Sequence, residues 1–197
     1  ETSRESPPAV CGCVSAYIGA LGASLGTMVA DLSSHRPGWD HRWEEFAVWA
    51  EKGMALQEEL LHLVDEDTEA FNKIMAAFGM PKATDGDKRW RSEAIEKATL
   101  FAAQVPLQTM KTSIKVFALC RAMVEKGNPN SVSDAGVGAL AARAAVLGAG
   151  MNVKINASSL KDRAKADALV AEAQALIDQA NAEEQAITAM VGKVIAK

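Results

Sequence analysis

The sequence predicts an all-α protein, a single-domain bundle of several helices that pack closely through alanine and glycine. Alanine accounts for 37 of the 197 residues, and only 5% of the residues are aromatic. Alanine is the strongest helix former, whereas sheets favour β-branched and aromatic side chains. A hydrophobic fraction of 49% excludes a disordered chain. Polar and apolar residues alternate only at 152–156, so no sheet is expected.

Two long helices are expected in the first half of the chain. We place the first from Ser15 to Leu32, because His35–Gly38 contains the helix breakers proline and glycine. The second runs from Asp40 to Phe78, with a bend expected at Gly53. Glycine and proline in the segment 79–81 then supply the stop signal.

Four further helical segments are expected in the second half: Asp87–Ala103, Leu107–Lys126, an alanine-rich helix from Ser133 or Asp134 to about Gly148, and Arg163–Ala196. Pro106 should kink or end the first of them. Ser133 or Asp134 should cap the alanine-rich helix. Residues 152–156 fit either a helix or a strand. Because no linker or repeat divides the chain, residues 15–197 are assigned to one helical domain, preceded by an N-terminal segment and loop at 1–14.

The segment Val14–Ala30 is long and apolar enough to raise the question of a membrane span. It carries no charge over 17 residues, which is the short edge of span length. The residues Glu1–Glu5 do not form a cationic signal start, and no second segment of that length stands out. Small residues recur along one stripe at Gly19, Gly22, Ala23, Gly26 and Ala30. We therefore predict a buried helix whose backbone lies close against a neighbour, and no membrane partner.

Charge and cysteine content limit the partners further. The net charge is −4, from 21 basic and 25 acidic residues. Nucleic acid is not an expected partner, because phosphate binding needs a clustered basic excess. Cys11 and Cys13 lie too close for an easy structural disulfide, which favours a reduced, cytoplasmic setting. Together with His35 and His41 they match no common zinc spacing, so no metal site is predicted.

Asp67 is the most informative candidate for chemistry. It lies in the middle of an apolar helical stripe formed by Leu56, Leu60, Leu63, Val64, Ala70, Phe71, Ile74, Ala77 and Phe78. A carboxyl group in that place would be desolvated, and desolvation raises its pKa. Asp67 could then hold and donate a proton near neutral pH. A structural role, with Asp67 paired to a basic or amide partner, stays open.

Amide-rich segments supply the candidate binding residues. Gly127–Ser131 leads into Ser133 and Asp134, whose side chains could cap a helix or contact a ligand. Asn152 and Asn156 share one face whether their segment is helical or extended. Paired amides can orient a flat, hydrogen-bonding heterocycle, or they can satisfy buried backbone groups.

Lys82 follows Pro81 in an expected tight turn. A cation held there could bind a carboxylate tail or stabilise a developing negative charge. Most such lysines are simply solvated, so this residue is the weakest of the candidates.

Several of these strings together resemble the cyclodeaminase/cyclohydrolase family of folate enzymes. The resemblance runs in order from about Ser15 to Asp162 and extends more loosely into the last helix. It rests on Leu63–Phe71, Met80-Pro81-Lys82 with Thr84, Val105-Pro106-Leu107, Gly127–Asn130, Ser133–Val137 and Asn152–Asn156.

The resemblance implies an all-helical homodimer that acts on a one-carbon unit carried by tetrahydrofolate, with no further cofactor. In the cyclodeaminase reaction, the second folate nitrogen attacks the formimino carbon of 5-formiminotetrahydrofolate, ammonia leaves, and 5,10-methenyltetrahydrofolate forms. The family's acid, the second Asp of its Val-Asp-x-Asp string, corresponds to Asp67. The residues that the resemblance places at the pterin site or its rim are Lys82, Asn128, Ser133, Asp134, Asn152 and Asn156.

Two departures from the family pattern bear on activity. The family opens its first helix with Pro-Gly-Gly-Gly-Ser, where this chain has Ala9–Cys13 and keeps only Gly12 as a candidate ligand contact. The family also tends to have Asn at the position of Asp31.

From the resemblance as a whole, formiminotetrahydrofolate cyclodeaminase is the predicted function, with methenyltetrahydrofolate cyclohydrolase as the alternative. A folate-binding or structural dimer with impaired catalysis is the second alternative.

Overall fold

The computed structural model describes residues 11–196, and its regular elements there are all helical. In chain order they are α1 (Cys11–Ser34), the short 3-10 helix η1 (Asp40–Arg42), α2 (Trp43–Phe78), α3 (Asp85–Lys126), the 3-10 helix η2 (Pro129–Ser131), α4 (Val132–Ser158) and α5 (Arg163–Ile195). The all-α prediction is confirmed.

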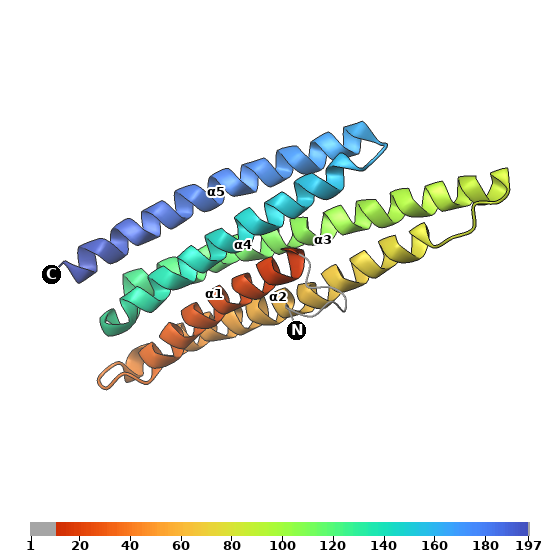
Figure 1. The fold of residues 1–197 in the computed structure, drawn as a ribbon. Helices are drawn as coiled ribbons and strands as arrows, with labels where there is room; N and C mark the ends of the chain where they lie inside the picture. Colours follow the sequence, from red (N-terminus) through yellow and green to blue (C-terminus); the bar gives the residue numbers. More distant parts are fainter. Residues whose placement is uncertain (1–10, 197) are drawn as a thin grey trace.

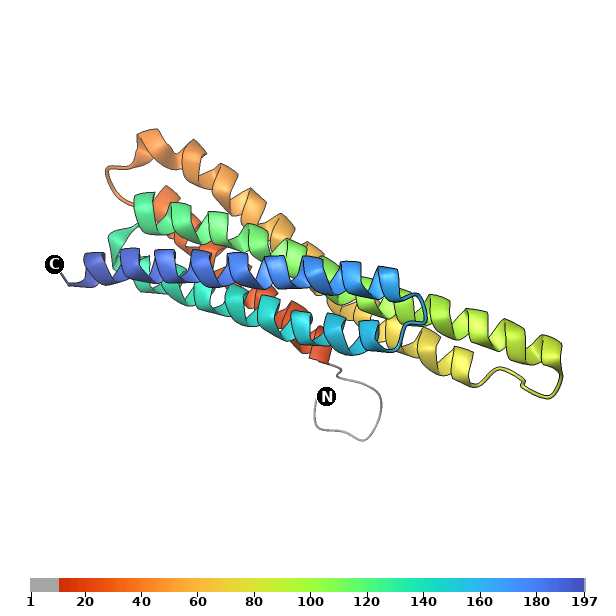
Figure 2. The same cartoon turned by 90° about the horizontal axis from the view of Figure 1, so that it is seen from above.

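The five long helices run nearly along one direction as an elongated bundle (Figures 1 and 2). α1 packs against α2, α4 and α3, while α5 covers α4 and α3. The ends of α2 and α3 that the 79–84 loop joins project beyond the other helices as a two-helix arm in both views. The N-terminal end of α1 lies near the root of this arm.

Small side chains let the helices approach one another closely. A Cβ atom on Gly22 would lie 2.8 Å from the carbonyl oxygen of Gly138, so glycine is required where α1 crosses α4. Buried alanines continue this contact at Ala16, Ala20, Ala23, Ala139, Ala142 and Ala149. The small-residue stripe predicted on the first helix is therefore confirmed as a packing surface.

Two helices are long and apolar enough to cross a membrane by length and composition, Gly12–Ser34 and Pro129–Ser158. In the bundle they lie side by side, and 61% and 56% of their most apolar windows are buried. The sequence prediction of a single candidate segment was therefore incomplete.

Three predicted element boundaries were wrong. α1 begins at Cys11 rather than Ser15, and α4 continues through residues 152–156 to Ser158. α3 is one helix that contains Pro106 instead of two helices that meet there. Tertiary packing holds this helix together, because Pro106 and its neighbours are buried and α3 packs against all four other long helices.

The predicted cap of α4 was also wrong. Its N-cap residue is Ser131, whose side chain makes no capping hydrogen bond. Ser133 and Asp134 lie inside the first turn, where the Asp134 carboxylate complements the helix dipole.

Candidate active site

Asp67 lies on α2 at the root of the arm and is only 5% exposed. Its carboxyl group faces the first turn of α1. A Cβ atom on Gly12 would lie 2.1 Å from Asp67 Oδ1, so the absence of a side chain at Gly12 makes room for the carboxyl group. The prediction that Asp67 is buried is confirmed, and Gly12 contacts this carboxyl group directly.

Cys13 is the principal hydrogen-bonding partner of Asp67. Its thiol donates to Asp67 Oδ2 over 3.1 Å, and its backbone N–H also donates to this carboxylate. The thiol lies 3.4 Å from Thr68 Oγ1, which in turn donates to the Val64 carbonyl oxygen. The first N–H groups of a helix have no partner within the helix. Asp67 therefore caps α1 from a distant part of the sequence.

Burial raises the pKa of Asp67, while the thiol and backbone N–H of Cys13 act in the opposite direction. The pKa remains above its ordinary value. The group can thus hold a proton closer to neutral pH than a solvated Asp, and the Cys13 donors stabilise the carboxylate that remains after the proton leaves.

A cavity of about 50 Å³ lies beside Asp67. It is lined by Asp67, Ala70, Phe71 and Ile74 of α2, Ala102 of α3, and Asn152 and Asn156 of α4. This volume suits a water molecule or a small polar group. The structure therefore brings Asp67, Asn152 and Asn156 together from helices distant in sequence.

The two asparagines are linked to each other and to α3. Asn156 Nδ2 donates to the carbonyl oxygen of Ala102 over 2.7 Å and to Asn152 Oδ1 over 2.9 Å. Among the described residues, Asn156 Oδ1 and Asn152 Nδ2 have no hydrogen-bonding partner. These two atoms are thus available to a ligand as one acceptor and one donor.

Lys82 does not lie beside Asp67 within the chain. It is exposed in the loop at the tip of the arm. At 1.5 Å per residue, the end of α2 lies about 17 Å from Asp67.

The other predicted binding residues lie at the opposite end of α4. From Ser133 to Asn152 the helix rises about 28 Å. Asn128 Oδ1 accepts the N–H of Asn130, and the backbone N–H of Asn128 donates to Ser33 Oγ over 2.8 Å. Within one chain, these groups and the nearby Ser133 and Asp134 cannot contact a ligand held by Asp67.

Gly12 and Asp31 belong to the two segments that depart from the family pattern, and they lie near opposite ends of α1. Ala9 and Val10 lie outside the described residues. Asp31 is exposed near the far end of α1, about 28 Å from Gly12 by helix rise. Within the chain it therefore has no direct influence on Asp67.

Sequence reasoning missed Cys13 and the carbonyl group of Ala102. Cys13 was assigned to a loop, although its position one residue after Gly12 at a helix start was a usable signal. The Ala102 carbonyl was detectable in principle, because it lies four residues before Pro106 and loses its helical donor.

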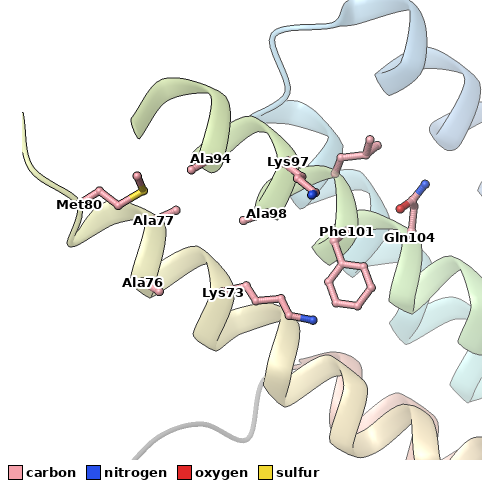
Figure 3. A pocket seen from close by; sticks show the side chains of 10 residues that line it. Lys73, Ala76, Ala77, Met80, Ala94, Lys97, Ala98, Phe101 and Gln104 are labelled. Carbon is pink, nitrogen blue, oxygen red and sulfur yellow. The ribbon is translucent and has the colours of Figure 1, made fainter. Parts of the chain in front are cut away.

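A larger cavity of about 710 Å³ lies between α2 and α3 in the arm. Figure 3 shows Lys73 and Lys97 projecting toward it from the two helices, with the ring of Phe101 beside them. Lys73 Nζ lies 4.2 Å from the centre of that ring and 3.4 Å from Glu69 Oε2. Asp67 and the two asparagines do not line this cavity, so it is separate from the acidic group.

Metal ligands are not clustered in the part of the chain that the structure describes: it contains no group of three His, Cys, Asp or Glu side chains placed to hold an ion. Asp67 accepts a hydrogen bond from a thiol and shares its cavity with amides and apolar side chains. This surrounding suits an uncharged carboxylic acid that donates a proton.

The chain is similar to folate enzymes in sequence and in fold. A family model described as formiminotransferase-cyclodeaminase matches residues 1–175. A methenyltetrahydrofolate cyclohydrolase of Methylorubrum extorquens is 36% identical over 176 residues, which cover 89% of this chain and 85% of that protein. The formimidoyltransferase-cyclodeaminase of Rattus norvegicus is 31% identical over 151 residues, but these cover only 28% of the rat protein.

The fold has a close counterpart among solved structures. A formiminotetrahydrofolate cyclodeaminase from Thermotoga maritima superposes with a TM-score of 0.85, covering 98% of this chain and 93% of that one. The sequence identity is 23%, so this likeness shows the shared fold alone.

Proposed function

The chain belongs to the formiminotransferase-cyclodeaminase family, and from this membership we propose the reaction that it catalyses. It is an enzyme of folate one-carbon chemistry, a cyclodeaminase or a cyclohydrolase. Within that class we propose methenyltetrahydrofolate cyclohydrolase as the first candidate. The observation that supports this choice is the match to a cyclohydrolase over 85% of its length.

Formiminotetrahydrofolate cyclodeaminase is the second candidate. It is supported by the cyclodeaminases of rat and Dictyostelium discoideum, which are 31% and 32% identical to the chain. The chain spans about a third or less of those relatives. The two reactions involve the same carbon and the same folate nitrogens, so a single acid can serve either.

In the cyclohydrolase reaction, water adds to the methenyl carbon that bridges N5 and N10 of tetrahydrofolate. The bond from this carbon to N5 then breaks, and the formyl group remains on N10. We assign the proton that N5 takes up to Asp67, whose raised pKa suits it as a general acid. One proton of the added water replaces the proton that Asp67 gives, and the other goes to solvent.

In the cyclodeaminase reaction, N10 attacks the formimino carbon on N5 and the carbon–nitrogen bond to the leaving amine breaks. The formimino nitrogen takes the proton of N10 and the proton of Asp67 and leaves as ammonia, and solvent then reprotonates Asp67. In both reactions Asn152 and Asn156 would contact the folate heterocycle. Neither reaction changes an oxidation state, so we propose no cofactor beyond the tetrahydrofolate that carries the carbon unit.

We further propose a homodimer that works in the cytoplasm. Large apolar side chains are exposed along one face of α1 and α4. They are Val14, Tyr17, Leu21, Met28, Leu32, Val137, Leu140, Met151 and Ile155. A patch of this kind usually marks an interaction surface. Light scattering should give twice the mass of the chain, and Leu21→Glu should yield monomers; a monomeric unaltered protein would contradict the proposal.

The choice between reactions is tested by supplying each substrate separately to the purified protein. A cyclohydrolase should consume methenyltetrahydrofolate faster than the spontaneous hydrolysis, and its absorbance would fall. A cyclodeaminase should release ammonia from 5-formiminotetrahydrofolate while methenyl absorbance rises. If neither substrate reacts above background from pH 5 to 9, calorimetry with a folate analogue separates a folate-binding dimer from a scaffold.

A further inference from the structure

Pro106 occupies a place in α3 where proline is normally avoided. In an uninterrupted helix, the N–H of residue 106 would donate to the carbonyl oxygen of Ala102. Proline has no N–H, and its ring crowds the carbonyl four residues earlier. The Ala102 carbonyl is therefore left without its helical donor at a buried position.

Asn156 of α4 supplies the missing donor. Its Nδ2 atom lies 2.7 Å from Ala102 O. A carbonyl oxygen can only accept a hydrogen bond, so the amide of Asn156 must present its NH2 group to α3 rather than its oxygen.

This orientation passes on to Asn152. Asn156 Nδ2 also donates to Asn152 Oδ1 over 2.9 Å, which fixes the Asn152 amide with its oxygen toward Asn156. The two remaining amide atoms, Asn156 Oδ1 and Asn152 Nδ2, belong to residues that line the cavity beside Asp67. The cavity thus offers one acceptor and one donor next to the acid.

We infer that Pro106 is a positioning residue: it frees the Ala102 carbonyl to orient Asn156 and, through it, Asn152 toward the substrate. An acceptor beside a donor matches an amide-like edge, in which an N–H lies next to a C=O. The pterin ring has such an edge. The inference rests on the proposed function for its ligand, but the orientation itself does not depend on it.

The test compares Pro106→Ala, Asn156→Ala and the double variant in the full chain. Pro106→Ala restores an N–H that competes with Asn156 for Ala102 O. We expect KM to rise about tenfold, the value of one hydrogen bond, with kcat within about threefold because Asp67 and Cys13 are untouched. Thermal stability should be unchanged or higher, because proline is unfavourable inside a helix.

The double variant distinguishes positioning from a general packing role. If Pro106 acts through Asn156, the double variant should have the KM of Asn156→Ala alone. Pro37→Ala, in the exposed loop that follows α1, is the matched control and should leave KM unchanged. An unaltered KM in Pro106→Ala, or effects of the two single variants that multiply, would overturn the inference.

A measurement without substrate separates this inference from the proposed function. In the unaltered protein, the side-chain NH2 protons of Asn156 should exchange slowly with solvent in ¹⁵N NMR spectra, and Asn156→Ala identifies their signals. Pro106→Ala should accelerate that exchange. Unchanged exchange refutes the inference even if the enzyme is active, whereas accelerated exchange supports it even if neither folate substrate reacts.

Discussion

The two ends of α1 differ in how their polar residues are used. At the N-terminal end, Gly12 and Cys13 enclose the buried Asp67 carboxyl group, and the asparagine pair lies beside the same cavity. At the C-terminal end, the buried Ser33 Oγ accepts the backbone N–H of Asn128, which lies in the loop after α3. The first end combines burial, a raised pKa and free amide atoms, whereas the second is a well-satisfied helix connection.

This difference shows why residue type alone does not identify a site. Amides and hydroxyls occur at both ends, and the family resemblance assigns both to the pterin site. Only the Asp67 end places an acid of raised pKa against unpaired donor and acceptor atoms. Substitutions at the two ends should therefore have very different effects.

Asp67→Asn should have the largest effect. The amide keeps the shape of the side chain but cannot supply a proton, so kcat should fall by about 10²- to 10⁴-fold, the typical value of general acid catalysis. Steady-state kinetics with the active folate substrate would measure it. Asp65→Asn, on the exposed side of the same helix, is the control; equal losses in both variants would remove Asp67 from the mechanism.

The same Asp67→Asn variant should be more stable than the unaltered protein above the folded-state pKa of Asp67. Burial raises this pKa, so the stabilisation from the neutral carboxyl group is fully present below the unfolded-state pKa. It is lost as pH rises through the folded-state pKa. Urea unfolding at pH 5 and pH 8 should show a stability gain for the variant that is larger at pH 8; a gain that shrinks with pH would contradict the burial argument.

Gly12→Ala should have the next largest effect. Alanine normally favours a helix over glycine by about 1 kcal/mol, so a purely local effect would be stabilising. The added Cβ atom would instead lie 2.1 Å from Asp67 Oδ1 and must displace the acid. We expect kcat to fall by about 10- to 100-fold, because small misplacements of reacting groups are costly. Gly192→Ala, where an added Cβ atom meets no neighbour within 4 Å, should leave kcat unchanged.

The sequence was sufficient for the fold class and for the burial of Asp67, because alanine content and the apolar stripe are properties of short segments. It also placed Asn152 and Asn156 on one face. It could not show that Cys13 and Ala102 meet these residues, since such contacts depend on how α1 and α3 pack. For the same reason the sequence could not show that α3 continues through Pro106 rather than ending there: burial of this residue in the bundle outweighs the local cost of proline.

Cys13→Ala should have a smaller effect that appears mainly in the pH profile. The thiol stabilises the Asp67 carboxylate and so lowers a pKa that burial raises. Its removal should therefore raise the pKa further. The decline of kcat with rising pH should move to higher pH, and the plateau should fall about threefold because Asp67 becomes a weaker acid.

Cys13→Ser tests whether hydrogen bonding causes this shift. A hydroxyl group retains the donor, so the pH profile should return close to that of the unaltered protein. Cys120→Ala controls for the loss of a buried thiol elsewhere, since burial raises the pKa of Cys120 to about 12 and this thiol lies in the core. If serine fails to restore the profile, Cys13 acts through packing alone.

Asn128→Ala should have the smallest effect and most directly tests the contrast between the two ends. Its side chain accepts only the N–H of Asn130 among the described residues, and the bond to Ser33 uses its backbone. We expect a loss of about 0.5–1 kcal/mol in the free energy of unfolding and kcat and KM within about twofold. A KM raised tenfold with little loss of stability would mean that this loop reaches the substrate, and only a second copy of the chain could bring it there. Repeating the measurement in the monomeric Leu21→Glu background would then decide, because the effect of Asn128→Ala must vanish when no second copy is present.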